Sequence, residues 1–155
     1  GRRIATPQLG NTQDVALRQY LAAAGLGPVE NGGNVEVVPT ENPQILDLFD
    51  RDEIDGAWVP EPWASRLILE GGGELFVDER DMWPDGDFVT ACVIVSTPFL
   101  ERHPEIVKAW LEAHVEVTLW ERENPGEASA LLNSEIERLT GRAMPEAVIS
   151  MAWTA

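Results

Sequence analysis

A glycine followed by two short polar residues lies where a strand is expected to give way to a helix. Gly10, Asn11 and Thr12 follow the strand-like residues 3–6 and open the amphipathic segment 12–24. The first amides of a helix are free donors at the positive end of the helix dipole, so this turn could bind an anion without a basic side chain. Gly10 would let a ligand approach the backbone. Helix capping alone explains the same residues, and both interpretations stay open.

A second candidate is Glu61, which stands between two prolines after the expected strand 54–59. Ligands of open α/β sheets gather at the carboxyl ends of strands. A carboxylate held there could accept hydrogen bonds from an amine or a hydroxyl, although an acid near a helix start is the alternative. Trp58 could line the same edge or pack in the core, since strand alternation puts it opposite Ala57 and Val59.

Patterns for catalysis or metal binding are not recognisable. His103 is expected to cap a helix and His114 to pack on an apolar helix face, and neither has zinc-ligand spacing to Cys or acidic residues. Ser65 lies outside the nucleophile-elbow pattern. Cys92 is the single cysteine and stands in an apolar run, which predicts a buried, inert thiol. We therefore expect no metal, no cofactor and no enzymatic activity.

Charge and length narrow the class of protein. The chain has 155 residues, enough for one ordinary domain, and 27 acidic against 11 basic residues give a net charge of −16. That field repels nucleic acid and anionic membranes, so neither is an expected partner. No apolar run approaches the roughly 18 residues of a membrane span.

Strand and helix signals alternate in the first half of the chain, with Asn11 as the expected helix cap, Asp14 as its capping-box partner and Gly25 as the helix stop. The expected strands are 3–6, 35–38, 54–59 and 75–77. This alternation predicts βαβ units and a largely parallel sheet. The second half reads as a long apolar strand at 88–96, then helices starting at prolines 98, 104, 125 and 145, the third reaching about residue 133.

Four segments carry a resemblance to a known family. They are residues 3–18 (RIATPQLGNTQDVALR), 54–67 (IDGAWVPEPWASRL), 76–86 (FVDERDMWPDG) and 99–107 (FLERHPEIV). In this order they resemble ABC-transporter solute-binding proteins of the aliphatic-sulfonate/taurine/nitrate group.

The resemblance implies an α/β type II periplasmic-binding-protein fold, in which two lobes hold a solute between them. Residues 1–87 would form the second lobe, a mixed, mostly parallel sheet flanked by helices. Residues 88–155 would be the return crossover strand and C-terminal helices of an incomplete first lobe. The chain is therefore expected to be a fragment of a longer protein.

The resemblance also implies a function, which is capture of a small anionic solute such as an aliphatic sulfonate for the membrane permease of an importer. The expected solute-binding residues are Gln8, Gly10, Asn11, Thr12, Trp58 and Glu61. The full-length protein would be periplasmic or extracellular, with a lipoprotein anchor as one arrangement. Two alternatives stay open: a biosynthetic enzyme on the same fold, of the thiamine-precursor or menaquinone-pathway type, and a structural fragment that binds nothing.

The apolar second half raises the question of what covers it. The strand 88–96 and a helix carrying Val107, Trp110, Leu111 and Val115 are expected to pack on first-lobe elements. An exposed apolar strand edge favours pairing with another chain. We expect either a homodimer that exchanges the C-terminal helices, or helices that fold back onto residues 1–87 of the same chain.

Overall fold

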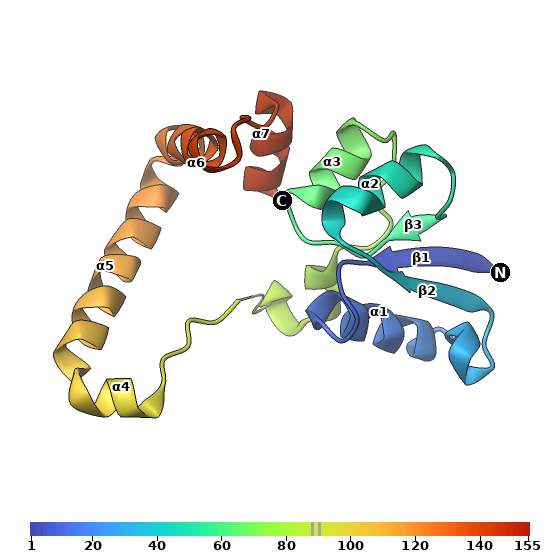
Figure 1. Cartoon of the computed structure of the whole chain (residues 1–155), viewed down its shortest axis with the longest axis horizontal. Helices are drawn as coiled ribbons and strands as arrows, with labels where there is room; N and C mark the ends of the chain where they lie inside the picture. The colour runs from blue at the N-terminus through green and yellow to red at the C-terminus, as the bar shows by residue number, and fades with distance from the viewer. Residues whose placement is uncertain (88, 90) are drawn as a thin grey trace. The chain divides into compact units, whose positions relative to one another are not determined.

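The computed structural model describes residues 1–87, 89 and 91–155, and these divide into two compact units. The first unit is Gly1–Met82 together with Glu146–Ala155, and the second is Trp83–Pro145. Figure 1 gives the elements of each. The assignment of residues 1–87 and 88–155 to two lobes stays a prediction.

A small parallel sheet forms the centre of the first unit. Its strands are β1 (Arg2–Thr6), β2 (Val35–Pro39) and β3 (Gly56–Ala57), in the order β2-β1-β3. Ala5 lies in register with Val38 on one side and Ala57 on the other. The α/β class and the parallel sheet predicted from the alternating pattern are confirmed.

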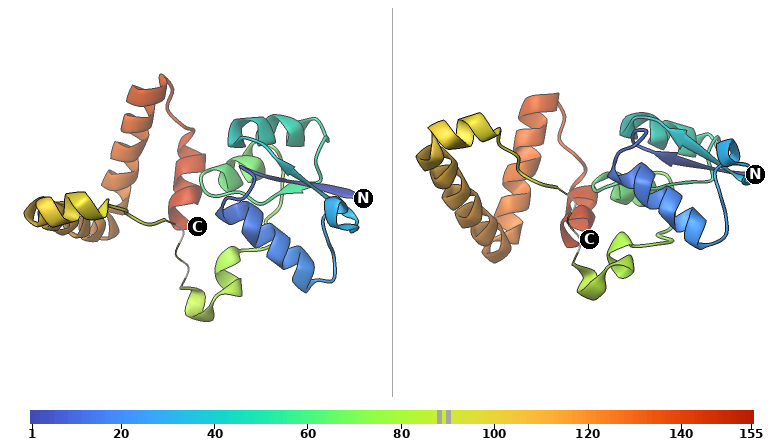
Figure 2. Two further views of the ribbon diagram at one scale, coloured as in Figure 1. Left: turned by 60° about the horizontal axis from the view of Figure 1, so that its bottom comes forward. Right: turned by 90° about the horizontal axis from the view of Figure 1, so that it is seen from below.

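Helices cover both faces of this sheet. The helices are α1 (Thr12–Ala23), α2 (Asn42–Asp50) and α3 (Trp63–Leu69). Leu17 and Leu21 of α1 pack on Val35 and Val37 of β2. A separate cluster packs Ala5 of β1 against residues of α2 and against Leu67 of α3. Figures 1 and 2 show α1 on one face and α2 with α3 on the other. Alternating strand side chains thus bury two apolar clusters, one on each face.

The ends of α1 follow from local residues. Asn11 Oδ1 accepts the Asp14 amide at 2.9 Å, which satisfies one free donor of the first turn. Gly25, in the left-handed region at φ +69°, follows the last turn, and the Leu26 amide returns to Leu21 O at 2.8 Å. The predicted cap and the predicted stop are both confirmed.

The last helix belongs to the first unit. α7 (Glu146–Thr154) packs on α3, and its Val148 and Ile149 are buried. The views in Figure 2 agree that the two helices lie side by side. Of the two arrangements expected for the C-terminal helices, α7 follows the one within the same chain.

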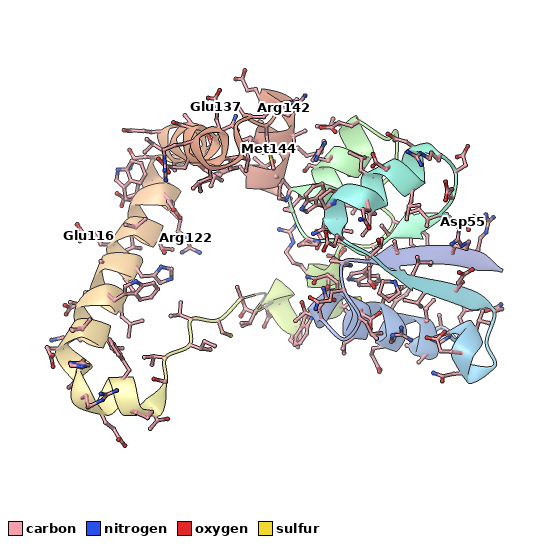
Figure 3. The ribbon with its side chains drawn as sticks, viewed as in Figure 1. Asp55, Glu116, Arg122, Glu137, Arg142 and Met144 are labelled. Carbon is pink, nitrogen blue, oxygen red and sulfur yellow. The ribbon has the colours of Figure 1, made fainter. Side chains whose placement is uncertain are left out.

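The second unit is helical among its described residues. It contains a short 3-10 helix (Pro84–Gly86), α4 (Thr97–Arg102), α5 (Pro104–Glu123) and α6 (Pro125–Thr140). α6 runs beyond the predicted end near residue 133, because no helix-stopping residue occurs before Gly141, whose φ is +80°. The Asn133 side chain then binds the backbone N–H and C=O of Met144, labelled in Figure 3, at 2.8 and 2.9 Å.

Three strand predictions were wrong in extent or in kind. The strand predicted at 54–59 is only Gly56–Ala57, because it pairs with Ile4 and Ala5 of β1 and β1 ends one residue later, at Thr6. Residues 75–77 are irregular and Phe76 is 87% exposed. Of the strand predicted at 88–96, residues 88 and 90 lie outside the described part, and 89 and 91–96 form no strand. A strand requires a hydrogen-bonded neighbour, and no described segment pairs with these residues.

Two burial predictions were also wrong. The Cys92 thiol is exposed, because the apolar run around it packs on nothing in the described part of its unit. His114 is exposed on α5 and stacks on Trp110 with ring centroids 5.2 Å apart. Among the helices that the structure describes, none is long and apolar enough to cross a membrane.

Candidate functional site

The predicted solute-binding residues follow two neighbouring strands at the carboxyl edge of the sheet. The loop after β1 carries Gln8, Gly10 and Asn11 and runs into Thr12, the first residue of α1. Gln8, Gly10 and Thr12 are exposed and Asn11 is half-buried. The segment after β3 carries Glu61, which is also exposed. Because β1 and β3 are parallel neighbours, both loops leave the sheet at the same edge.

The β1–α1 loop has a defined conformation. Gly10 adopts φ +77°, and its amide donates to Asp14 Oδ2 at 2.9 Å. The Thr12 hydroxyl donates to Gln13 Oε1 at 3.0 Å. The Gly10 amide, predicted as a donor to a ligand, is therefore already engaged within the protein. The side chains of Gln8 and Asn11 remain at the surface of the loop.

Glu61 caps α3 with one of its carboxylate oxygens. Its Oε2 accepts the Ser65 amide at 3.2 Å, four residues on. This is the helix-start role that the sequence left open, and it fixes where the carboxylate lies. Glu61 is exposed, and among the residues that the structure describes its second oxygen accepts no hydrogen bond.

Trp58 packs on the α1 face of the sheet. Its ring lies against the cluster containing Leu17 and 5.4 Å from the Tyr20 ring, at a tilted angle. Its indole Nε1–H donates to Glu79 Oε2 at 2.9 Å. The side chain is half-buried, so the structure favours packing over the lining of an open edge.

A buried carboxylate beneath the loop was missed as a functional candidate. Asp14 is 2% exposed and accepts the Thr6 hydroxyl at 3.2 Å and Arg18 Nε at 3.0 Å, besides the Gly10 amide. Arg18 also donates to Glu30 Oε1 at 2.5 Å. The i,i+4 spacing of Asp14 and Arg18 was the available sequence signal. The contacts of Asp14 with Thr6 and Gly10 could be identified only from the tertiary structure.

These contacts determine the ionisation of the group. Burial acts to raise the pKa of Asp14, but hydrogen bonds from Arg18, Gly10 and Thr6, with the Arg18 charge, outweigh it and leave the pKa lowered. The hydrogen bond to Asp14 is the main cause of the raised pKa of Arg18. Asp14 and Arg18 are therefore a charged pair at neutral pH.

A different group of charged residues holds the opposite edge of the sheet. Asp55, labelled in Figure 3, bonds the Arg2 guanidinium and accepts the Arg3 amide at 2.8 Å. Arg3 also pairs with Glu36 at 3.1 Å. These contacts join the starts of the strands and lie away from the carboxyl edge. Among the described residues, no group of His, Cys, Asp and Glu side chains is arranged to hold a metal ion.

The model of the NMT1-like family matches residues 1–133. A taurine-binding periplasmic protein of Escherichia coli (strain K12) is 32% identical over 117 residues, which is 75% of this chain and 34% of that protein. A nitrate/nitrite binding protein NrtA of Nostoc sp. is 28% identical over 111 residues, covering 72% of this chain and 24% of that protein.

The match therefore concerns part of each relative. This chain spans 34% of the taurine-binding protein and 29% of a further nitrate/nitrite binding protein, that of Synechocystis sp., to which it is 24% identical over 133 residues. No solved structure matches. All four matched segments of the sequence, from residue 3 to residue 107, fall within the range covered by the family model.

Proposed function

This chain belongs to the NMT1-like family, and on that premise we propose that it is part of the solute-binding component of an ABC importer for a small anionic solute. The observation that carries the proposal is the 32% identity to a taurine-binding periplasmic protein over 117 residues. It is supported by exposed polar residues in the β1–α1 loop, and by the exposed Glu61 after β3, at the carboxyl edge of a parallel sheet, where open α/β folds bind ligands.

The proposed solute is an aliphatic sulfonate, held at the β1–α1 loop. Asn11 Oδ1 already accepts the Asp14 amide, so the donor half of the Asn11 side chain is what remains for the anion. Gln8 and Thr12 lie beside it on the exposed loop, and the first turn of α1 adds the positive end of a helix dipole. Leu9, 68% exposed in the same loop, offers apolar contact to an alkyl chain.

Glu61 is proposed to accept a hydrogen bond from an amine at the other end of the solute. Its capping bond to the Ser65 amide holds the carboxylate at the neighbouring loop. Trp58 would hold this segment in place rather than contact the solute. Its ring packs on the α1 face of the sheet and its indole N–H donates to Glu79. A solute with an anionic group and an amine would then bridge the two loops. Taurine has that composition.

The mechanism proposed for the whole protein is non-covalent. Two lobes close on the solute and the closed form docks on the membrane permease. The relatives are binding proteins by name, and we propose that this protein likewise catalyses no reaction. Its proposed location is the periplasm or the cell exterior, with a lipoprotein anchor on the full-length protein.

A homodimer is proposed for the chain itself. One face of α5 leaves three large apolar side chains exposed at a spacing of four residues: Leu111, Val115 and Leu119. Each such side chain gains roughly 1.5–3 kcal/mol when it is buried. A second copy that pairs on this face would remove them from water. α7 would stay with its own chain, because its apolar residues already pack on α3.

Isothermal titration calorimetry of the full-length protein tests the solute proposal. Taurine should bind, and ethanolamine, which has the amine but no sulfonate, should not. Asn11→Ala should weaken taurine binding by about tenfold, the effect of losing one hydrogen bond to a charged group. Asn31→Ala is the control, since Asn31 is exposed on a short 3-10 helix (Val29–Asn31).

Three results would contradict the proposal. The first is equal binding of taurine and ethanolamine, and the second is binding of neither. The third is a new product, found by mass spectrometry after incubation with taurine, whose formation depends on Glu61. That third result would favour the enzyme alternative.

A further inference from the structure

Asp14 connects three parts of the polypeptide that meet at the β1–α1 loop. Its Oδ1 accepts the hydroxyl of Thr6, the last residue of β1. Its Oδ2 accepts the amide of Gly10 in the loop and Nε of Arg18, one turn further along α1. Strand end, loop and helix are therefore all bonded to one carboxylate.

The arrangement is buried on its inner side and open on its outer side. Asp14 is 2% exposed and Thr6 is fully buried, whereas Gly10 is exposed. Gln8 and Leu9 lie in the sequence between the two donors, Thr6 and Gly10, and both are exposed. Among the described residues of this turn, the Asn11 amide also donates to Gln8 O, at a long 3.3 Å. The carboxylate is thus the strongest restraint on the exposed loop.

The charge of Arg18 makes the buried Asp14 carboxylate compatible with an anionic solute at the loop. An unpaired carboxylate beneath the loop would repel a sulfonate and cancel part of the field of the helix start. The guanidinium of Arg18 lies 3.0 Å from Asp14 and is itself held by Glu30 at 2.5 Å. Arg18 thus neutralises Asp14 beneath the loop, and the single negative charge that remains on the group of Asp14, Arg18 and Glu30 belongs to the exposed Glu30, where water and salt screen it.

We infer that Asp14 is a positioning residue for solute binding: its Arg18-paired carboxylate fixes the β1–α1 loop through the Gly10 amide and the Thr6 hydroxyl. This inference rests on the proposed function, because the loop it positions is the proposed site for the anion. Asp14 itself lies behind the loop and touches no solute.

The test uses Asp14→Asn in the full-length protein, with Asp47→Asn as matched control. Asp47 is an exposed aspartate of α2 in the same unit. An asparagine is uncharged, so the bonds that its one oxygen accepts from the Gly10 amide and Arg18 lose their charge assistance. Hydrogen exchange of the Gly10 amide, followed by NMR, should accelerate about tenfold or more, the size expected for one charge-assisted bond. Amides of Leu17 and Val37 in the core should change much less.

Binding of taurine gives the second readout. Asp14→Asn should raise the Kd for taurine about tenfold, and Asp47→Asn should leave it unchanged. Arg18→Met should also weaken binding, while Arg18→Lys, which keeps the positive charge, should restore most of it. A role in stability alone would accelerate all core amides together and would not distinguish Lys from Met. If Asp14→Asn does not fold, Thr6→Val removes one of the same bonds more gently.

The outcomes separate this inference from the proposed function. Unchanged Gly10 exchange in Asp14→Asn, or faster exchange with an unchanged Kd, would overturn the positioning role while taurine binding by the wild type stands. Absence of taurine binding by the wild type would instead overturn the proposed function.

Discussion

Trp58 and Glu79 are joined by a hydrogen bond from the indole Nε1–H to Oε2, 2.9 Å long, across 21 residues of sequence. Trp58 follows β3, and Glu79 begins a short 3-10 helix (Glu79–Met82). Residues 72–78 between them have no regular structure. This bond, together with the packing of the Trp58 ring, therefore holds the start of the 3-10 helix at Glu79 against the α1 face of the sheet.

Removal of this bond should destabilise the first unit. Glu79→Ala should lower the free energy of unfolding by about 1 kcal/mol, because a half-buried indole N–H loses a charged acceptor. Glu79→Gln keeps an acceptor and should cost less. Urea unfolding followed by circular dichroism measures both. Glu74→Ala, at an exposed residue nearby, is the control, and equal losses in Glu74→Ala and Glu79→Ala would contradict this role.

The stability contributed by Asp14 should depend on pH in one direction. The pKa of Asp14 is lowered from 3.8 in the folded chain, so the unfolded chain takes up the proton first as the pH falls. The contribution is therefore present above about pH 4 and is lost as the pH falls through the folded pKa. Urea unfolding of wild type and Asp14→Asn should differ most at neutral pH and converge under acid.

Other acids provide the background for that comparison. The pKa values of Glu30, Asp55 and Asp78 are also lowered, with hydrogen bonds from arginine side chains or backbone amides as causes. Asp14→Asn should therefore still lose stability in acid, only less steeply. A difference between the two proteins that stays constant from neutral pH to pH about 3 would contradict the ionised state of Asp14.

Gly10 and Gly72 allow the backbone conformation of the loop to be tested separately from its contacts. Both have positive φ, +77° and +69°, and an added Cβ would meet no atom within 4 Å at either. Alanine should therefore cost roughly 1–2 kcal/mol at each, from the left-handed conformation alone. Only Gly10→Ala should weaken taurine binding in calorimetry. Equal effects of the two variants on taurine binding would argue against the loop as the site.

Thr6 and Ser65 are both fully buried hydroxyl residues, but they differ in their hydrogen bonds. Thr6 donates to Asp14, whereas Ser65 Oγ has no hydrogen-bond partner in the described part of the chain. Thr6→Val should cost about 1–3 kcal/mol, since it leaves a buried acceptor short of a donor. Ser65→Ala should leave the free energy of unfolding unchanged or raise it, because a buried polar atom without a partner is removed. Thermal unfolding of the two variants checks this contrast.

The proposed dimer predicts a particle twice the mass of the 17.1 kDa chain in light scattering. Leu111→Glu on the exposed face of α5 should return it to the monomer mass, because a charge cannot be buried in that interface without a partner. Leu75→Glu, at a 65% exposed leucine of the first unit, should not. A wild-type monomer at micromolar concentration would rule out the dimer.

Elements whose limits depend on neighbouring residues were predictable from sequence. The start of α1 at Asn11 and its end before Gly25 use bonds within a few residues. The start of α5 after His103 follows from Pro104, whose missing amide is tolerated in the first turn. The alternation of strands and helices likewise predicted the parallel sheet.

The strands that failed show the limit of such patterns. Residues 75–77 and 91–96 have strand-like composition but no described partner, so they form no strand and leave Phe76 and Ile94 about nine-tenths exposed. Cys92 was placed in a core by the residues around it, yet burial depends on what covers a segment. Residue composition gives a preference for the strand conformation, but a strand forms only where a neighbouring segment pairs with it.

The sequence by itself determined that Gly10, Asn11 and Thr12 form a polar turn at a helix start, because capping is a matter of adjacent residues. Only the tertiary structure decided that Trp58 packs on α1 and that the Gly10 amide is taken by Asp14. Strand order and helix packing bring the end of β1 beside the first turns of α1, and a buried carboxylate binds whichever donors that packing places within reach.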